Sequence, residues 1–128
     1  MKKNFKLVMM LLSLCIVVVA GFSICSYAKE GTYATLYGLC EYDAGDKTYT
    51  GYASATNKSG TTRYINISLK TTNSAVITSN GRAVGSGFNV ETPYVNITTY
   101  SYVYGSCTVY NAGSPSSGVA ETLTVTIR

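Results

Sequence analysis

The stretch RYINISLKT, at residues 63–71, decides the fold class. Isoleucine and leucine alternate here with polar residues, so one face of an extended chain is apolar and the other is polar. This period of two is typical of a strand with one packed and one solvated face, the pattern of antiparallel sheets. The same alternation runs through residues 93–104 and 119–127, and no segment after residue 28 has a helical period. The sequence therefore predicts an all-β domain.

Turn residues separate these runs. Asn80-Gly81 is the strongest signal, because both central positions of a type I′ hairpin turn need positive φ. NKSG at 57–60 and DAGD at 43–46 predict two further turns. Seven or eight strands without helices between them favour a single antiparallel β-sandwich of immunoglobulin-like architecture. Membership of the immunoglobulin family itself is not expected, because the chain lacks the tryptophan that packs on the bridge of such domains.

The first 28 residues have the three parts of a secretory signal peptide. Lysines at positions 2, 3 and 6 form a positive start, and residues 7–24 are an apolar run without a charged side chain. Ser26 and Ala28 then supply small residues at the two positions that a signal peptidase reads. We therefore expect cleavage between Ala28 and Lys29, which leaves residues 29–128 as one secreted, extracellular domain. The alternative is an uncleaved membrane anchor, since such an apolar run is just long enough to span a bilayer.

Removal of this segment would change both the charge and the cysteine count. Three of the ten basic residues would leave with it, so seven basic and six acidic residues would remain, which argues against a nucleic-acid partner. Two of the four cysteines would remain, Cys40 and Cys107. An even pair in an oxidising compartment predicts one disulfide between them. Because the chain has no histidine, a zinc site would lack ligands, and we expect no metal and no cofactor.

The lack of histidine also excludes His-based triads and dyads. Glu121 lies on the inward parity of the last strand and is the acidic residue that a hydrolase would need; the simpler interpretation is a solvated residue at the sheet edge. Glu41, Asp43 and Asp46 surround a turn and offer a calcium alternative, but their spacing favours ordinary turn acids. The sequence predicts a non-enzymatic protein without catalytic residues.

Tyrosine is the residue in excess. Eleven of the twelve tyrosines follow residue 28, in a chain without tryptophan. Four share one parity of the strand predicted at residues 93–104 and form the candidate ligand-binding set: Tyr94, Tyr100, Tyr102 and Tyr104. Such a ladder offers flat apolar faces rimmed by hydroxyls, suited to a glycan, a lipid headgroup or a protein. The alternative is structural, because tyrosine is a good strand former that pairs across strands.

Several short segments carry a resemblance to a known family: EGTY at 30–33, YG at 37–38, KTYT at 47–50, and ASATN at 53–57 followed by Gly60. Together they resemble the beginning of the lactococcin-972-type bacteriocins, which are small secreted β-sandwich proteins that act on the cell envelope of related bacteria. The resemblance spans about 30 residues and transfers no functional residue, because the family's His and Trp positions are absent here.

These observations lead to two functional expectations. The first is a non-enzymatic, secreted β-sandwich that binds a component of a cell surface or envelope through its tyrosine-rich face, with membrane contact only through the signal peptide. The second, implied by the resemblance, is a bacteriocin-like antimicrobial protein acting on the envelope of related bacteria.

Overall fold

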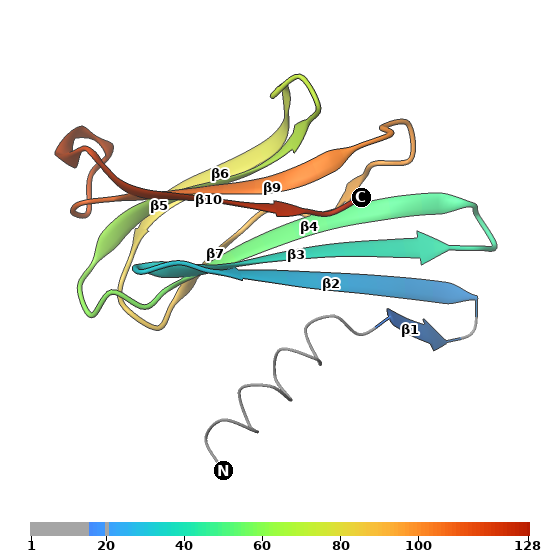
Figure 1. Cartoon of the computed structure of the whole chain (residues 1–128), viewed down its shortest axis with the longest axis horizontal. Helices are drawn as coiled ribbons and strands as arrows, with labels where there is room; N and C mark the ends of the chain where they lie inside the picture. The colour runs from blue at the N-terminus through green and yellow to red at the C-terminus, as the bar shows by residue number, and fades with distance from the viewer. Residues whose placement is uncertain (1–15, 20) are drawn as a thin grey trace, which may run out of the picture.

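The computed structural model describes residues 16–19 and 21–128, and these form two antiparallel sheets (Figure 1). The first sheet has the order β1-β2-β3-β4-β7, with β8 also paired to β4: β1 (Ile16–Val19), β2 (Phe22–Glu30), β3 (Ala34–Asp43), β4 (Thr48–Asn57), β7 (Asn89–Glu91) and β8 (Val95–Asn96). The second has the order β10-β9-β5-β6: β5 (Arg63–Thr71), β6 (Val76–Val84), β9 (Val103–Tyr110) and β10 (Val119–Thr126). A 3₁₀ turn, Pro115–Ser117, precedes β10. The predicted all-β class and antiparallel sandwich layout are confirmed.

A single apolar core lies between the two sheets. Strand β5 shows its origin, because the alternating Ile65, Ile67 and Leu69 are all fully buried. Leu36 from the opposite sheet and Val109 from β9 belong to the same cluster. Removal of such side chains from water is the main favourable term in folding, about 1.5–3 kcal/mol for each side chain of this size. The prediction that residues 63–71 form a strand with one buried, apolar face is therefore confirmed.

Two of the three predicted turns are confirmed, and the third is wrong. The chain turns after β3 and after β4, where Gly60 has a φ of +83°. Asn80-Gly81, in contrast, lies inside β6, where Gly81 pairs with Asn66 of β5. A Cβ at Gly81 would lie 2.6 Å from the Tyr64 hydroxyl oxygen, so the Tyr64 side chain would have to shift to admit a larger residue. The β5–β6 connection instead turns through Ser74, which has a φ of 60°.

The strand predicted at residues 93–104 is interrupted, and the chain changes sheets within it. Val95 and Asn96 form β8 against β4, in the first sheet, whereas β9 begins at Val103 in the second. The intervening residues fold into a turn, in which the Tyr100 amide donates to the Ile97 carbonyl at 3.1 Å. This division, together with the strands before residue 31, raises the number of described strands to ten.

Strand β2 runs across the expected cleavage point between Ala28 and Lys29. It pairs with β3 in unbroken register from Phe22 opposite Asp43 to Glu30 opposite Thr35. Residues 1–15 and 20, which make up most of the predicted signal peptide, lie outside the described residues. In the described part of the chain, no helix has the length and apolarity to cross a membrane.

The predicted Cys40–Cys107 disulfide is wrong: the structure has no bond between these residues, and they lie too far apart along the strands to form one. Gly38 of β3 and Gly105 of β9 lie opposite each other, against the same two side chains of β10. Cys40 lies two residues from Gly38, towards the β3–β4 turn. Cys107 lies two residues from Gly105, towards the opposite end of the sandwich. Their offset along the strands, roughly 13 Å, exceeds the Cα separation of about 7 Å that a disulfide can bridge.

The buried Cys107 thiol makes stability depend on pH in the alkaline range. Burial raises its pKa to about 12, from an ordinary value of 9.0, with a smaller contribution from the Glu121 carboxylate. Because the folded state holds this proton more tightly than the unfolded state, its contribution to stability is complete below pH 9.0 and is lost as the pH rises towards 12. We expect the melting temperature of wild type to fall more steeply than that of Cys107→Ala between these values. Parallel curves would contradict the assignment.

Candidate functional site

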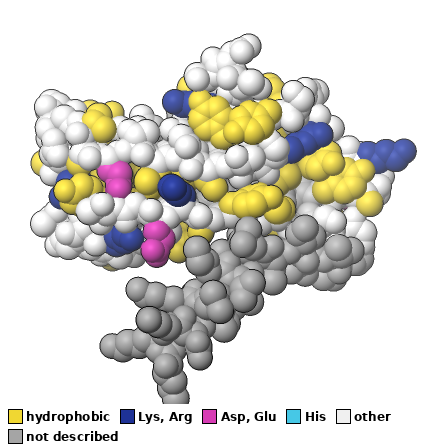
Figure 2. All heavy atoms as spheres, in the orientation of Figure 1, with side chains coloured by type: hydrophobic (Ala, Val, Ile, Leu, Met, Phe, Trp, Pro, Cys, Tyr) yellow, Lys and Arg dark blue, Asp and Glu magenta, His cyan; other side chains and the backbone are white. Residues whose placement is uncertain are grey.

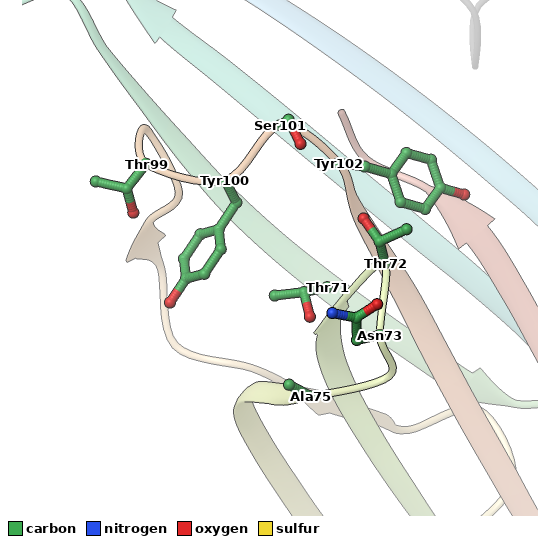
Figure 3. A pocket seen from close by; sticks show the side chains of 8 residues that line it. All are labelled: Thr71, Thr72, Asn73, Ala75, Thr99, Tyr100, Ser101 and Tyr102. Carbon is green, nitrogen blue, oxygen red and sulfur yellow. The ribbon is translucent and has the colours of Figure 1, made fainter.

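A surface pocket of about 370 Å³ lies where the β5–β6 turn meets the segment leading into β9. The turn contributes the residues Thr71, Thr72, Asn73 and Ala75, and the segment contributes Thr99, Tyr100, Ser101 and Tyr102 (Figure 3). The pocket thus combines two residues of the predicted tyrosine set with six residues that no local sequence pattern marks as a site. Their Ser, Thr and Asn composition resembles an ordinary turn, and only the fold places the two segments together.

The tyrosine side of the pocket is held by several contacts to the strands beneath it. Arg128 donates to the carbonyl oxygens of Ile97 and Thr98, at 3.2 Å each. Its guanidinium also stacks over the Tyr49 ring, 3.6 Å from the centroid. The Thr98 hydroxyl accepts from the Tyr49 amide at 2.8 Å. These contacts join the segment before Tyr100 to β4 and to the C-terminal residue, so this side is fixed before any ligand arrives.

The opposite side is a tight turn. The Thr71 amide donates to the Ala75 carbonyl at 3.0 Å, and the Ser74 amide donates to the Thr71 carbonyl at 2.9 Å. Asn73, at its tip, is exposed. Figure 3 shows the Tyr100 side chain on the side of its segment where the turn lies, whereas the Tyr102 ring points away from the turn. Tyr100 is therefore the aromatic residue on the turn side of the pocket.

Tyr102 and Tyr104 form a second aromatic surface next to the pocket. Their ring centroids lie 6.0 Å apart at an interplanar angle of 38°. The Tyr102 hydroxyl lies 3.4 Å from the Thr126 hydroxyl, and the Tyr104 hydroxyl lies 3.1 Å from that of Ser74. The turn and the start of β9 are thereby linked through the side-chain oxygens of Ser74 and Tyr104, and the Tyr102 ring is exposed.

Tyr94 lies away from this set. It precedes β8 in the first sheet and stacks on Tyr52, with centroids 4.5 Å apart and an interplanar angle of 13°. The four predicted tyrosines therefore do not form one ladder, because the chain leaves the first sheet between Tyr94 and Tyr100. The structure brings Tyr100, Tyr102 and Tyr104 together and separates Tyr94 from them.

The pocket lining is uncharged, and most of its exposed surface is apolar carbon. Hydroxyl groups and one side-chain amide supply its polar atoms, and none of the eight residues carries a charge. A smaller hollow of about 180 Å³ occupies the outer face of the second sheet, lined by Asn66, Ser68, Lys70, Val76, Ser79, Ser106 and Thr108. Lys70 lines the smaller hollow, and its neighbour in the chain, Thr71, lines the pocket. Among the residues that line these two hollows, Lys70 is the only charged one.

Glu121, the acid that a hydrolase would need, is hydrogen-bonded to backbone amides. Its two carboxylate oxygens accept from the amides of Thr32 and Tyr33, at 2.6 and 2.9 Å. It thereby holds the β2–β3 turn against β10. Asp43 has a similar local role, since it accepts from the amide of Gly45 at 2.8 Å. Within the described ranges, no group of three or more Cys, Asp or Glu side chains is arranged to hold a metal ion.

The contacts of Glu121 predict a structural effect of its substitution. In Glu121→Gln, one acceptor oxygen becomes an amide that cannot accept from the turn, so one backbone N–H loses its partner. We expect the free energy of unfolding to fall by about 1–2 kcal/mol, measured by urea denaturation. Glu91→Gln, at an exposed position, is the matched control and should change stability by less than about 0.5 kcal/mol. Equal losses of stability in Glu121→Gln and Glu91→Gln would show that Glu121 does not hold the turn.

Comparison with known proteins does not assign the chain: no family model, no curated protein and no solved structure matches it.

Proposed function

We propose that this protein is exported and binds an uncharged, hydroxyl-rich ligand, such as a glycan chain of a cell envelope, without chemical turnover. The observation that carries the proposal is the pocket in which the Tyr100 ring lies on the same side as a turn that supplies hydroxyl groups, with no charged residue in the lining. The expected localisation is extracellular, on the strength of the predicted signal peptide.

The chemistry of the pocket favours a sugar over the other ligands that a tyrosine-rich surface could take. A pyranose ring presents an apolar face that can lie on an aromatic ring, and hydroxyl groups at its edge that pair with Ser, Thr and Asn side chains. A lipid phosphate or a nucleic acid would require cationic partners, which this lining lacks. Figure 2 shows that the surface seen there is mostly uncharged, with hydrophobic side chains in separate patches.

The fixed geometry of the site also supports binding. Arg128 and Thr98 hold the tyrosine segment through hydrogen bonds, so little conformational entropy is lost there when a ligand docks. Immobilising a side chain that is mobile in the free protein would cost about 0.5–1.5 kcal/mol. The shallow, open form of the pocket suits one or two units of a longer chain.

The test is retention on an array of neutral oligosaccharides and on purified cell-wall glycan. Wild type should be retained, and Tyr100→Ser combined with Tyr102→Ser should lose at least tenfold in affinity. Because Tyr100 packs against the core, Asn73→Ala provides a second variant at an exposed turn position and should also weaken binding. Tyr94→Ser, on the other sheet, should bind as wild type does. No retention of wild type, or equal retention of all four proteins, would contradict the proposal.

The bacteriocin-like alternative keeps a specific observation in its favour. The residues that carry the resemblance lie in the β2–β3 turn and on the paired strands β3 and β4, so they form one connected part of the fold. We expect purified protein spotted on lawns of Gram-positive bacteria to leave growth unchanged. A clearing zone would instead support the antimicrobial function.

A further inference from the structure

Two cysteines lie directly opposite each other in the first sheet. Cys25 of β2 is the register partner of Cys40 of β3. Facing residues of an antiparallel pair have Cα atoms about 4.5–5.5 Å apart and side chains on the same side of the sheet. That separation falls within the 4.4–6.8 Å range of disulfides. Both residues are free thiols in the structure, Cys25 half-buried and Cys40 buried.

Strand β2 is paired along its whole length within the first sheet. Its nine residues pair with β3 without a register shift, and the turn that follows is held by Glu121 of β10. Cleavage after Ala28 would remove seven of those nine residues. It would expose the backbone of β3 from Tyr37 to Asp43 as a sheet edge without proline or lysine, a form of edge that invites aggregation.

The sequence offers an earlier processing point that leaves β2 whole. Cleavage there would remove β1, which pairs with only the first four residues of β2, Phe22 to Cys25. Ala20 and Gly21 are small residues immediately before Phe22, the first residue of β2, and either can be the residue before the cut; the third residue before the cut is then Val18 or Val19. The apolar run from Leu7 to this point fits the 7–15 residues typical of a signal-peptide core, whereas a run extending to Ile24 exceeds it.

We propose that the signal peptide is removed ahead of β2, and that the exported domain carries a Cys25–Cys40 disulfide across β2 and β3. The proposal rests on the export that the proposed function assumes, but not on the ligand. The bond forms by exchange with a disulfide oxidant of the export compartment. The half-buried Cys25 thiolate attacks the oxidant disulfide, and the Cys40 thiolate then displaces the oxidant thiol. Two protons leave the cysteines, and the oxidant departs as a dithiol carrying the two electrons.

Cys107 provides the internal control. It lies in the core, fully buried, on the other sheet, and roughly 13 Å along the strands from Cys40. The exported protein should therefore contain one linked pair and one thiol that reacts only after unfolding.

The experiment expresses the full chain in a secreting bacterial host and analyses the exported protein by intact mass, before and after reduction, and by peptide mapping. We expect an N-terminus at Phe22 or Gly21, a gain of about 2 Da on reduction, and a linked peptide pair containing Cys25 and Cys40. Cys107→Ser should keep the link, and Cys25→Ser should lose it. An N-terminus at Lys29, three free thiols in the exported protein, or failure of the chain to be processed would overturn the proposal. Loss of glycan binding in a correctly processed, linked protein would overturn the proposed function alone.

Discussion

Replacing Asn57 with alanine is expected to lower the free energy of unfolding by about 2–4 kcal/mol. Asn57 is fully buried at the end of β4. Its amide nitrogen donates to the carbonyl oxygens of Thr61 and Val84, at 2.8 and 2.9 Å. Its side-chain oxygen accepts from the amide and the hydroxyl of Ser59, at 2.9 and 2.8 Å. One side chain thus joins the turn after β4 to the end of β6, in the opposite sheet.

The cost is large because the partners of Asn57 remain after the substitution. Alanine removes both donors, and the Val84 carbonyl is left without that donor in a site closed to water. A buried polar group that loses its partner costs about 1–3 kcal/mol. Asn57→Asp should be nearly as harmful, because a carboxylate has no N–H to donate to either carbonyl.

Thermal unfolding followed by circular dichroism measures the effect. For a domain of this size we expect the melting temperature to fall by roughly 10–25 °C. Asn66→Ala is the matched control, since Asn66 is exposed on the outer face of β5, and should shift stability by less than about 0.5 kcal/mol. Equal melting temperatures for Asn57→Ala and Asn66→Ala would show that Asn57 does not connect the two sheets as described.

The second large effect is expected at Gly38 of β3, which lies against side chains from the opposite sheet. A Cβ at this position would lie 2.9 Å from the Cγ1 atoms of both Val125 and Ile127. These are branched side chains of the β10 segment, and neither can move away without disturbing the core. Gly38→Ala should therefore destabilise the protein by about 1–3 kcal/mol, and Gly38→Val by more.

Urea denaturation of Gly38→Ala, compared with Gly113→Ala, measures this effect. At Gly113 the nearest atom to a new Cβ is 3.6 Å away, on Thr62, so alanine there should be neutral or slightly stabilising. A midpoint for Gly38→Ala equal to that of Gly113→Ala would show that the sheets have room at this point, contrary to the described packing.

Local sequence patterns predicted some elements correctly and others incorrectly, and individual residues show why. Ile65 and Leu69 alternate with polar neighbours because the fold keeps one face of β5 in the core, so the pattern and the outcome coincide. The sequence pattern places Gly81 in a turn, but it lies within β6, paired with Asn66 of β5 and close to the Tyr64 side chain. A glycine that permits a turn and a glycine that permits a close contact look the same in sequence.

The candidate site was predicted only in part. Tyr100, Tyr102 and Tyr104 were singled out from their parity, and the structure keeps them together. Tyr94 shares that parity but lies on the other sheet, because the chain crosses between sheets after Asn96. The β5–β6 turn that completes the pocket is far from Tyr100 in sequence, and no local pattern links the two.

The sequence by itself determined the all-β class and the buried face of β5, and it supports the expectation of export. These depend on periodicity and composition, which act over a few residues. Only the tertiary structure decided which cysteines face each other, which acid is held by the backbone, and which tyrosines share a surface. Each of these depends on the register between strands that are distant in the chain, and that register is set by the packing of the whole core.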